Sequence, residues 1–177
     1  AAIKEAMQFA WDLKARVLIC RIGRIVDDAD SAEGARQREV LLELAQHGNR
    51  VGVTLAVTPS GDSPALLRSL LDSIDNGPLG IDFDPAERVM SHHPPVDSLR
   101  IVYGHPMHLT VRDALQDEDG TGRETTVGRG EVPWEQLLAT LEEMSYTGWM
   151  TVDRRTGEDP LTEMTRAVAF INGMSAR

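Results

Sequence analysis

Two aspartates each follow a short apolar segment, a position from which a carboxylate can bind a cation or move a proton. Asp84 comes directly after Leu79–Phe83, whose alternating apolar residues are typical of a buried strand, and Pro85 then ends the pairing. Asp153 follows the apolar segment 148–152. The carboxyl ends of buried strands are where α/β folds hold ligands and metals, so two carboxylates there would attract a divalent cation. The alternative is that Asp84 only caps the turn before a helix.

Other charged residues leave the nature of this site open. Asp62 and Glu87 are near enough in sequence to join the two aspartates in a carboxylate-rich site for Mg²⁺ or Ca²⁺. The adjacent Arg154 and Arg155 could instead neutralise the carboxylates, which would give a structural charge network without a metal.

The histidines are weaker candidates for metal ligands. His92 and His93 precede two prolines in a polar stretch, and adjacent side chains on an extended segment point apart. His105 and His108 flank the start of a predicted strand. His108 could donate to a site one layer beneath the strand ends, but we expect it to be a buried histidine with a hydrogen-bond partner.

Alternating strands and helices must position these residues. Apolar runs predict five strands, near 17–20, 51–57, 79–83, 107–111 and 148–152. Helical spacing predicts helices at 1–14, about 35–46 with Gly48 ending it, from Pro64, within 96–102, from Pro133 and after Pro160. Residues 115–132 form a polar, Gly-rich excursion that is long enough to be a functional loop. Repeated βα units predict a parallel sheet, as an open doubly wound sheet or as a barrel.

The composition excludes several classes of function. A chain of 177 residues with 41% hydrophobic and 26% charged residues is typical of one globular domain. The formal net charge of −10 argues against a nucleic-acid partner and an anionic membrane surface, and no apolar run could span a bilayer. The single cysteine, Cys20, excludes an internal disulfide and favours a cytoplasmic location. The chain opens in mid-helix without methionine, so we expect it to be part of something longer.

Several segments together resemble the xylose isomerase-like TIM-barrel family of sugar phosphate isomerases and epimerases. The resemblance covers about residues 50–155 and rests on motifs in a fixed order: Gly52-Val53-Thr54-Leu55-Ala56, Gly80-Ile81-Asp82-Phe83-Asp84-Pro85, His108-Leu109-Thr110-Val111-Arg112-Asp113, Gly128-Arg129-Gly130-Glu131-Val132-Pro133-Trp134 and Tyr146-Thr147-Gly148-Trp149-Met150-Thr151-Val152-Asp153.

The resemblance implies an α/β fold of the (β/α)₈ TIM-barrel type that is partial. A complete barrel takes about 250 residues, and the five units here correspond to strands four to eight. Residues 1–177 are thus expected to be a single domain without its N-terminal βα units. Open sheet edges would remain or would pair with a partner, so a homo-oligomer is a possible outcome.

The resemblance also implies a metal site for Mn²⁺ or Mg²⁺ at the ends of the last four strands, built from Glu, Asp, His and Glu. These four positions fall on Thr58, Asp84, Thr110 and Asp153. Asp84 and Asp153 are therefore the expected metal ligands, and the two threonines have lost the usual donor. The site is expected to be degenerate and metal binding weak.

The same alignment of motifs assigns the remaining roles. Asp153 would be the catalytic carboxylate, and Glu87, Arg112 and Asp113 would bind the substrate, a small sugar or polyol. The first functional hypothesis is a sugar isomerase- or epimerase-like domain. The alternative is a catalytically inactive relative that binds a carbohydrate or a protein. A hydro-lyase or endonuclease of the same superfamily is a third, and the acidic charge disfavours the endonuclease.

Overall fold

A computed structural model describes residues 2–75, 77–117, 121–157 and 159–175. Residues 118–120, which belong to the predicted loop 115–132, lie outside this range. In the part of the chain that is described, no helix combines the length and the apolar character that a membrane span requires.

The described residues form a five-stranded sheet in the order in which its strands follow along the chain. The order is β1-β2-β3-β4-β7, with bounds Val17–Arg21, Thr54–Thr58, Leu79–Phe83, Pro106–Val111 and Trp149–Val152. β1 pairs with β2 in parallel, Val17 opposite Thr54, and β2 pairs with β3 in parallel, Leu55 opposite Leu79. All five predicted strands exist, and their order is the predicted one.

The second strand begins later than predicted, because the preceding helix is longer. Helix α2 spans Ala32–Val51 and ends at Gly52, whose φ of 78° is the left-handed conformation that suits glycine. The prediction that Gly48 ends this helix is wrong. Gly48 lies inside α2, where an added Cβ would stand 2.3 Å from the Val53 carbonyl oxygen. Position 48 therefore requires glycine because the chain packs closely there, and not because the helix ends there.

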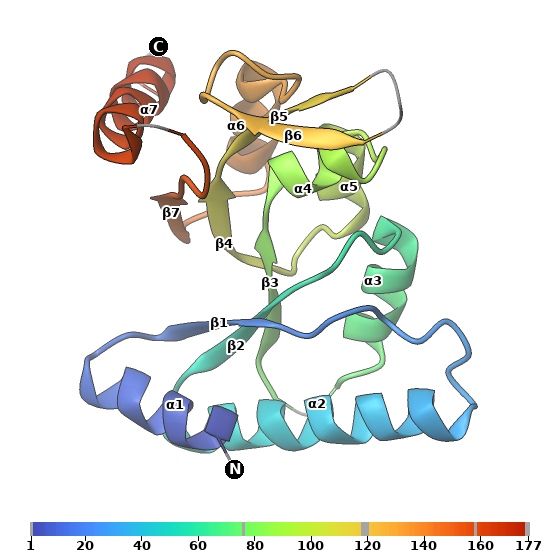
Figure 1. The fold of residues 1–177 in the computed structure, drawn as a ribbon. Helices are drawn as coiled ribbons and strands as arrows, with labels where there is room; N and C mark the ends of the chain where they lie inside the picture. The colour runs from blue at the N-terminus through green and yellow to red at the C-terminus, as the bar shows by residue number, and fades with distance from the viewer. Residues whose placement is uncertain (1, 76, 118–120, 158, 176–177) are drawn as a thin grey trace. The chain divides into compact units, whose positions relative to one another are not determined.

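The chain divides into two compact units, of which the first comprises Ala1–Asp82 and His105–His108. Its helices are α1 (Ala2–Asp12), α2 and α3 (Pro64–Asp72), and α1 and α2 lie side by side along β1 and β2 in Figure 1. Ser63 caps α3, because its hydroxyl accepts from the Leu66 N–H, and the helix begins at Pro64 as predicted. The core of this unit is apolar and includes Met7, Leu41, Leu55, Val57 and Leu70.

The second unit comprises Phe83–Gly104 and Leu109–Arg177. It holds α4 (Pro85–Met90), α5 (Pro95–Ile101), α6 (Trp134–Glu143) and α7 (Pro160–Ser175). The predicted excursion 115–132 contains regular structure: β5 (Asp113–Gln116) and β6 (Gly122–Thr125) form an antiparallel ribbon that lies against α4 (Figure 1). These strands were not predicted, because their residues are mostly polar and their runs are short.

Candidate functional site

Asp84 stands at the end of β3 and at the start of α4, and both of its carboxylate oxygens have partners. Oδ1 accepts the Glu87 N–H at 3.2 Å, so Asp84 is the N-cap of α4. Oδ2 accepts from Nη1 of Arg112 at 2.5 Å. The expected alternative, a helix-capping Asp84, is thus present, together with an ion pair that the sequence did not reveal.

Arg112 follows β4 and binds two carboxylates at once. Its Nη1 contacts Asp84, and its Nε donates to Glu124 Oε1 at 3.0 Å. The Arg112 side chain is 5% exposed and that of Asp84 is 2% exposed. Burial raises the pKa of the Asp84 carboxyl, and the Arg112 guanidinium opposes that shift. Burial alone would lower the pKa of Arg112, but its two carboxylate partners outweigh burial and raise it.

Glu124, on β6, is a member of the site that no sequence pattern indicated. Its Oε2 accepts from the Thr156 N–H at 2.9 Å and from the Thr156 hydroxyl at 2.8 Å, and it also accepts from the Arg155 N–H. Burial would raise the pKa of Glu124, but the hydrogen bonds from Thr156, Arg112 and Arg155 outweigh burial and lower it. Glu124 therefore ties the β5–β6 ribbon to Arg112 and to the segment after β7.

Asp153 belongs to the same charge network. Its backbone N–H donates to the Val111 carbonyl at 3.3 Å, which places the end of β7 beside the end of β4. Its Oδ2 accepts from Arg155 Nε at 2.8 Å. Arg154 bridges Glu124, at 3.7 Å, and Glu163 of α7. We call the set Asp84, Arg112, Glu124, Asp153, Arg154, Arg155 and Glu163 the arginine network.

Asp113 holds the loop that precedes α6. It is completely buried, and its two oxygens accept five hydrogen bonds, from the N–H groups of Ala114, Gly128, Gly130 and Val132 and from the Trp134 indole N–H. A Cβ on Gly130 would stand 2.1 Å from Asp113 Oδ1. The motif Gly128–Trp134 is thus explained by one carboxylate: small residues bring the backbone N–H groups close enough to donate to it.

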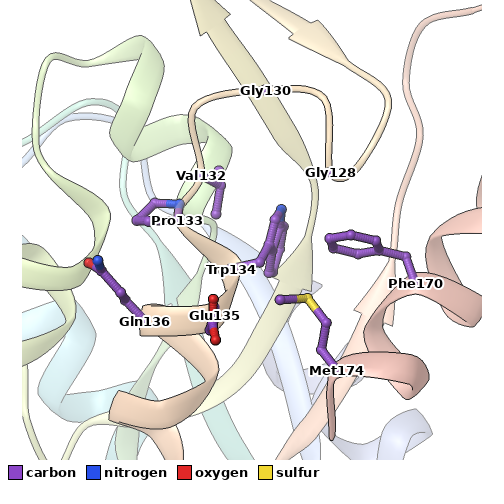
Figure 2. A pocket seen from close by; sticks show the side chains of 9 residues that line it. All are labelled: Gly128, Gly130, Val132, Pro133, Trp134, Glu135, Gln136, Phe170 and Met174. Atoms are coloured by element: carbon purple, nitrogen blue, oxygen red, sulfur yellow. The ribbon is translucent and has the colours of Figure 1, made fainter. Parts of the chain in front are cut away.

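A pocket opens beside this loop (Figure 2). Its volume is approximately 270 Å³, and the Trp134, Phe170 and Met174 side chains face one another across it while Glu135 and Gln136 line its rim. None of the predicted site residues is among those that line it. Asp113 contributes indirectly, because it fixes the Trp134 ring through the indole N–H.

Thr58 is part of a buried polar cluster in the first unit. The Thr58 hydroxyl donates to Asp82 Oδ2 at 2.8 Å, and His108 Nδ1 lies 2.8 Å from Asp82 Oδ1. His108 is 7% exposed, so the expected buried histidine with a hydrogen-bond partner is confirmed. Asp62 accepts from the N–H groups of Ile25 and Ser60, which gives it a role in holding two loops together.

The remaining candidates lie in both units and make contacts of their own. Glu87 is half-buried in the first turn of α4, and Thr110 is buried on β4. His92 Nδ1 lies 3.0 Å from the Gln116 side-chain amide, and His105 Nε2 lies 3.0 Å from Asp72 Oδ1. The first contact is in the second unit and the other is in the first.

The residues present do not fit a divalent metal ion. Such an ion needs several oxygen or nitrogen atoms with lone pairs directed at one point. Asp84 is engaged by its own helix and by a guanidinium, and Asp153 is paired with Arg155. Among the described residues, three or more His, Cys, Asp or Glu side chains nowhere form a group that could hold a metal.

Comparisons with known proteins give a consistent result. A sequence model of the family described as "Xylose isomerase-like TIM barrel" matches residues 1–173. A search of curated protein sequences found no match.

Solved structures match almost the whole chain. A xylose isomerase domain protein from Planctomyces limnophilus is 24% identical, with a TM-score of 0.88 over 98% of this chain and 64% of its own. A D-tagatose 3-epimerase-like protein is 17% identical, with a TM-score of 0.76 over 98% and 69%. A xylose isomerase-like TIM barrel protein from Mycobacterium smegmatis in complex with magnesium is 16% identical, with a TM-score of 0.79 over 97% and 64%. The chain thus spans about two thirds of these proteins, and at these identities the likeness concerns the fold.

Proposed function

The chain belongs to the xylose isomerase-like TIM barrel family, and from this premise we propose that it is a sugar isomerase- or epimerase-like domain with a degenerate divalent-metal site at the C-terminal ends of its strands. The predicted fold, a partial TIM barrel, is confirmed by the sheet order and by relatives of which the chain spans 64% to 69%. Activity and substrate are matters of proposal, because fold alone does not specify them.

The observation that carries the proposal is the arginine network in the second unit. It connects Asp84, Arg112 and Asp153, three of the residues that the family resemblance assigns to the site. Arg112 binds both Asp84 and Glu124, and Glu124 accepts from Arg155, whose side chain pairs with Asp153. Active sites of barrel enzymes lie at the C-terminal ends of the strands, where these residues stand. A sugar is the proposed substrate because related structures include a sugar epimerase-like protein.

We assign roles to the residues according to their surroundings. Asp153 is the proposed catalytic carboxylate, because its side chain is 39% exposed and can exchange Arg155 for a substrate. Glu87, half-buried in the first turn of α4, is the proposed sugar-binding carboxylate. Arg112 orients Asp84 and Glu124. Asp113 supports the loop before α6 and is not proposed to touch the sugar, since five donors already occupy its two oxygens.

The proposed reaction class is proton transfer at a carbon next to a carbonyl group. A carboxylate takes the proton, the electron pair moves onto the carbonyl oxygen, and a proton returns to the same carbon or its neighbour. Relatives that bind a divalent ion would use it to polarise that oxygen. The residues here do not fit such an ion, so no step is routed through one.

A second function is favoured by a specific observation. Asp84 and Asp153 are both paired with arginines, and Thr58, at the position expected for a second carboxylate base, carries no acidic group. A non-catalytic module that binds a carbohydrate or a protein needs neither an acid nor a base. The same network could position hydroxyl groups of a sugar without any chemistry.

Solvent-exchange measurements separate the two functions. We would incubate the protein in D₂O with a panel of ketopentoses and ketohexoses and follow deuterium incorporation next to the carbonyl by NMR, while saturation-transfer signals report binding. Exchange that is lost in Asp153→Asn supports the isomerase-like function. Binding without exchange supports the carbohydrate-binding function. Neither exchange nor binding for any sugar would contradict both the isomerase-like and the carbohydrate-binding function.

A further inference from the structure

The Arg112 guanidinium binds Asp84, one of the two carboxylates that the family resemblance assigns to a metal ion. We propose that its guanidinium has replaced the divalent ion as the permanent counter-charge of Asp84, so that the strand ends of the second unit exclude Mg²⁺ and Mn²⁺. The cause of weak metal binding is then the presence of Arg112, in addition to the missing ligands at Thr58 and Thr110.

The geometry at Asp84 carries this inference. One oxygen lies 2.5 Å from Arg112 Nη1, and the other accepts the N-cap hydrogen bond of α4 at 3.2 Å. An ion bound to Oδ2 would stand about 2.0 to 2.6 Å from that oxygen and therefore next to the guanidinium, and two cations that close repel each other strongly in a buried site. Ion and guanidinium are therefore mutually exclusive at Oδ2.

The guanidinium is also held too firmly to step aside. Its Nε is fixed by Glu124 at 3.0 Å, and Glu124 is in turn held by hydrogen bonds from Thr156 and from the Arg155 N–H. The Arg112 side chain is 5% exposed, and an arginine stays charged at any pH at which proteins fold. Displacing it would leave a buried cation unpaired, which is strongly unfavourable.

Neighbouring positions do not compensate. Thr110 offers a neutral hydroxyl, a weak ligand for a divalent ion, and Asp153 is paired with Arg155 at 2.8 Å. The inference concerns the cation at this site and does not depend on which sugar is bound. Sugar binding can therefore fail in the preceding experiment without any effect on the metal measurement.

Manganese titration tests the proposal. Free Mn²⁺ is followed by electron paramagnetic resonance for wild type, Asp84→Asn, Arg112→Met and Arg155→Met, with circular dichroism as a check of folding. Wild type and Asp84→Asn are expected to show the same weak binding, with dissociation constants on the order of 1 mM or above, as for loosely built sites. Arg112→Met leaves the Asp84 and Glu124 carboxylates facing one space and is expected to bind Mn²⁺ at least about tenfold more tightly.

Arg155→Met is the matched control. It also removes an arginine from a candidate ligand, Asp153, but it leaves the Arg112 contacts in place, so its Mn²⁺ affinity is expected to equal that of wild type. Micromolar binding by wild type that Asp84→Asn abolishes would overturn the proposal. A folded Arg112→Met variant without a gain would overturn it too. If Arg112→Met does not fold, the comparison of wild type with Asp84→Asn decides alone.

Discussion

Glu124 shows how one side chain can hold several segments in place. It lies on a short polar strand, yet its carboxylate accepts from Arg112, Arg155 and Thr156, which belong to two other segments of the chain. Charge-assisted hydrogen bonds of this kind stabilise more than neutral ones, and a buried partner left without its acceptor costs free energy. The network therefore depends more on Glu124 than on Asp153, whose side chain pairs with Arg155.

The first prediction concerns the pH dependence of this contribution. Glu124→Gln is expected to lower the free energy of unfolding by about 2 kcal/mol at pH 7, because Arg112 loses a charged acceptor. The folded-state pKa of Glu124 lies below its ordinary value of 4.5, so its stabilisation is complete above that value and is lost as the pH falls through the folded-state pKa. The difference between wild type and variant should narrow below about pH 4.5.

Urea unfolding followed by circular dichroism at several pH values measures this difference. Glu135→Gln is the control, since Glu135 lines the open pocket and should leave stability within about 0.5 kcal/mol of wild type. A gap between wild type and Glu124→Gln that widened in acid would contradict the assignment. The pKa of Asp84 is shifted upward, so Asp84 also makes stability depend on pH. Wild type and Glu124→Gln both keep Asp84, so the difference between them reports the contribution of Glu124.

At the scale of the element, the loop before α6 is organised by the side chain of the first residue of β5. Asp113 supplies two oxygens to five donors, and α6 begins at Trp134 without a side-chain cap. A buried carboxylate thus holds the loop in position. Gly130 is required at its position because any side chain would collide with that carboxylate.

The second prediction tests this arrangement with Asp113→Asn. The asparagine NH₂ group would face N–H groups that need an acceptor, so at least two of the five hydrogen bonds are lost. The free energy of unfolding should therefore fall by about 3 kcal/mol. Amide hydrogen exchange at Gly128, Gly130 and Val132 should accelerate most. Asp97→Asn is the control, because its side chain is 70% exposed. Unchanged protection at these three amides would contradict the model of a loop held by Asp113.

Sequence patterns predicted the elements with strong signals. Apolar runs identified the five strands, and Pro64 and Pro133 located two helix starts. The α4 helix was absent from the predicted helices because its six residues are too few to show a helical periodicity. The end of α2 was misplaced because Gly48 and Gly52 look alike in sequence, and only packing distinguishes them.

The candidate site was predictable in its positions and not in its contacts. Resemblance placed Asp84 and Asp153 at strand ends, and both are there. The contact between Arg112 and Asp84 could not be predicted. Glu124, which holds Arg112 in place, lies on a ribbon whose strands carry no apolar pattern. Charged side chains have many possible partners in a sequence, and tertiary structure selects among them.

At the scale of the whole molecule, the notable feature is the pair of edge strands of the five-stranded sheet, β1 and β7. Trp149 on β7 is 78% exposed and Ile19 on β1 is 43% exposed, whereas every residue of β3 is buried. Among the described residues, each of these edge strands pairs with one strand of the sheet, and a strand edge of this kind can accept a further strand. We propose that copies of the chain associate through these edges.

The third prediction is therefore self-association at micromolar concentration. Trp149→Lys places a charge on β7 and should raise the dissociation constant at least about tenfold in analytical ultracentrifugation. Leu161→Lys is the control: Leu161 is 77% exposed on α7, so its replacement removes a comparable apolar surface away from the strand edges. Wild type that stays monomeric at all concentrations would contradict the prediction, as would equal effects of both substitutions.

The arginine network also affects the kinetics of folding and unfolding. Its members are far apart along the chain: Arg112 and Asp84 are separated by 28 positions, and Glu124 and Thr156 by 32. Contacts of this separation require large loops to close, whereas helices form from near neighbours. The network should consequently assemble after the rate-limiting step of folding. Stopped-flow experiments on Glu124→Gln should then show faster unfolding and an almost unchanged refolding rate, so that Glu124 determines how long the native state persists once it has formed.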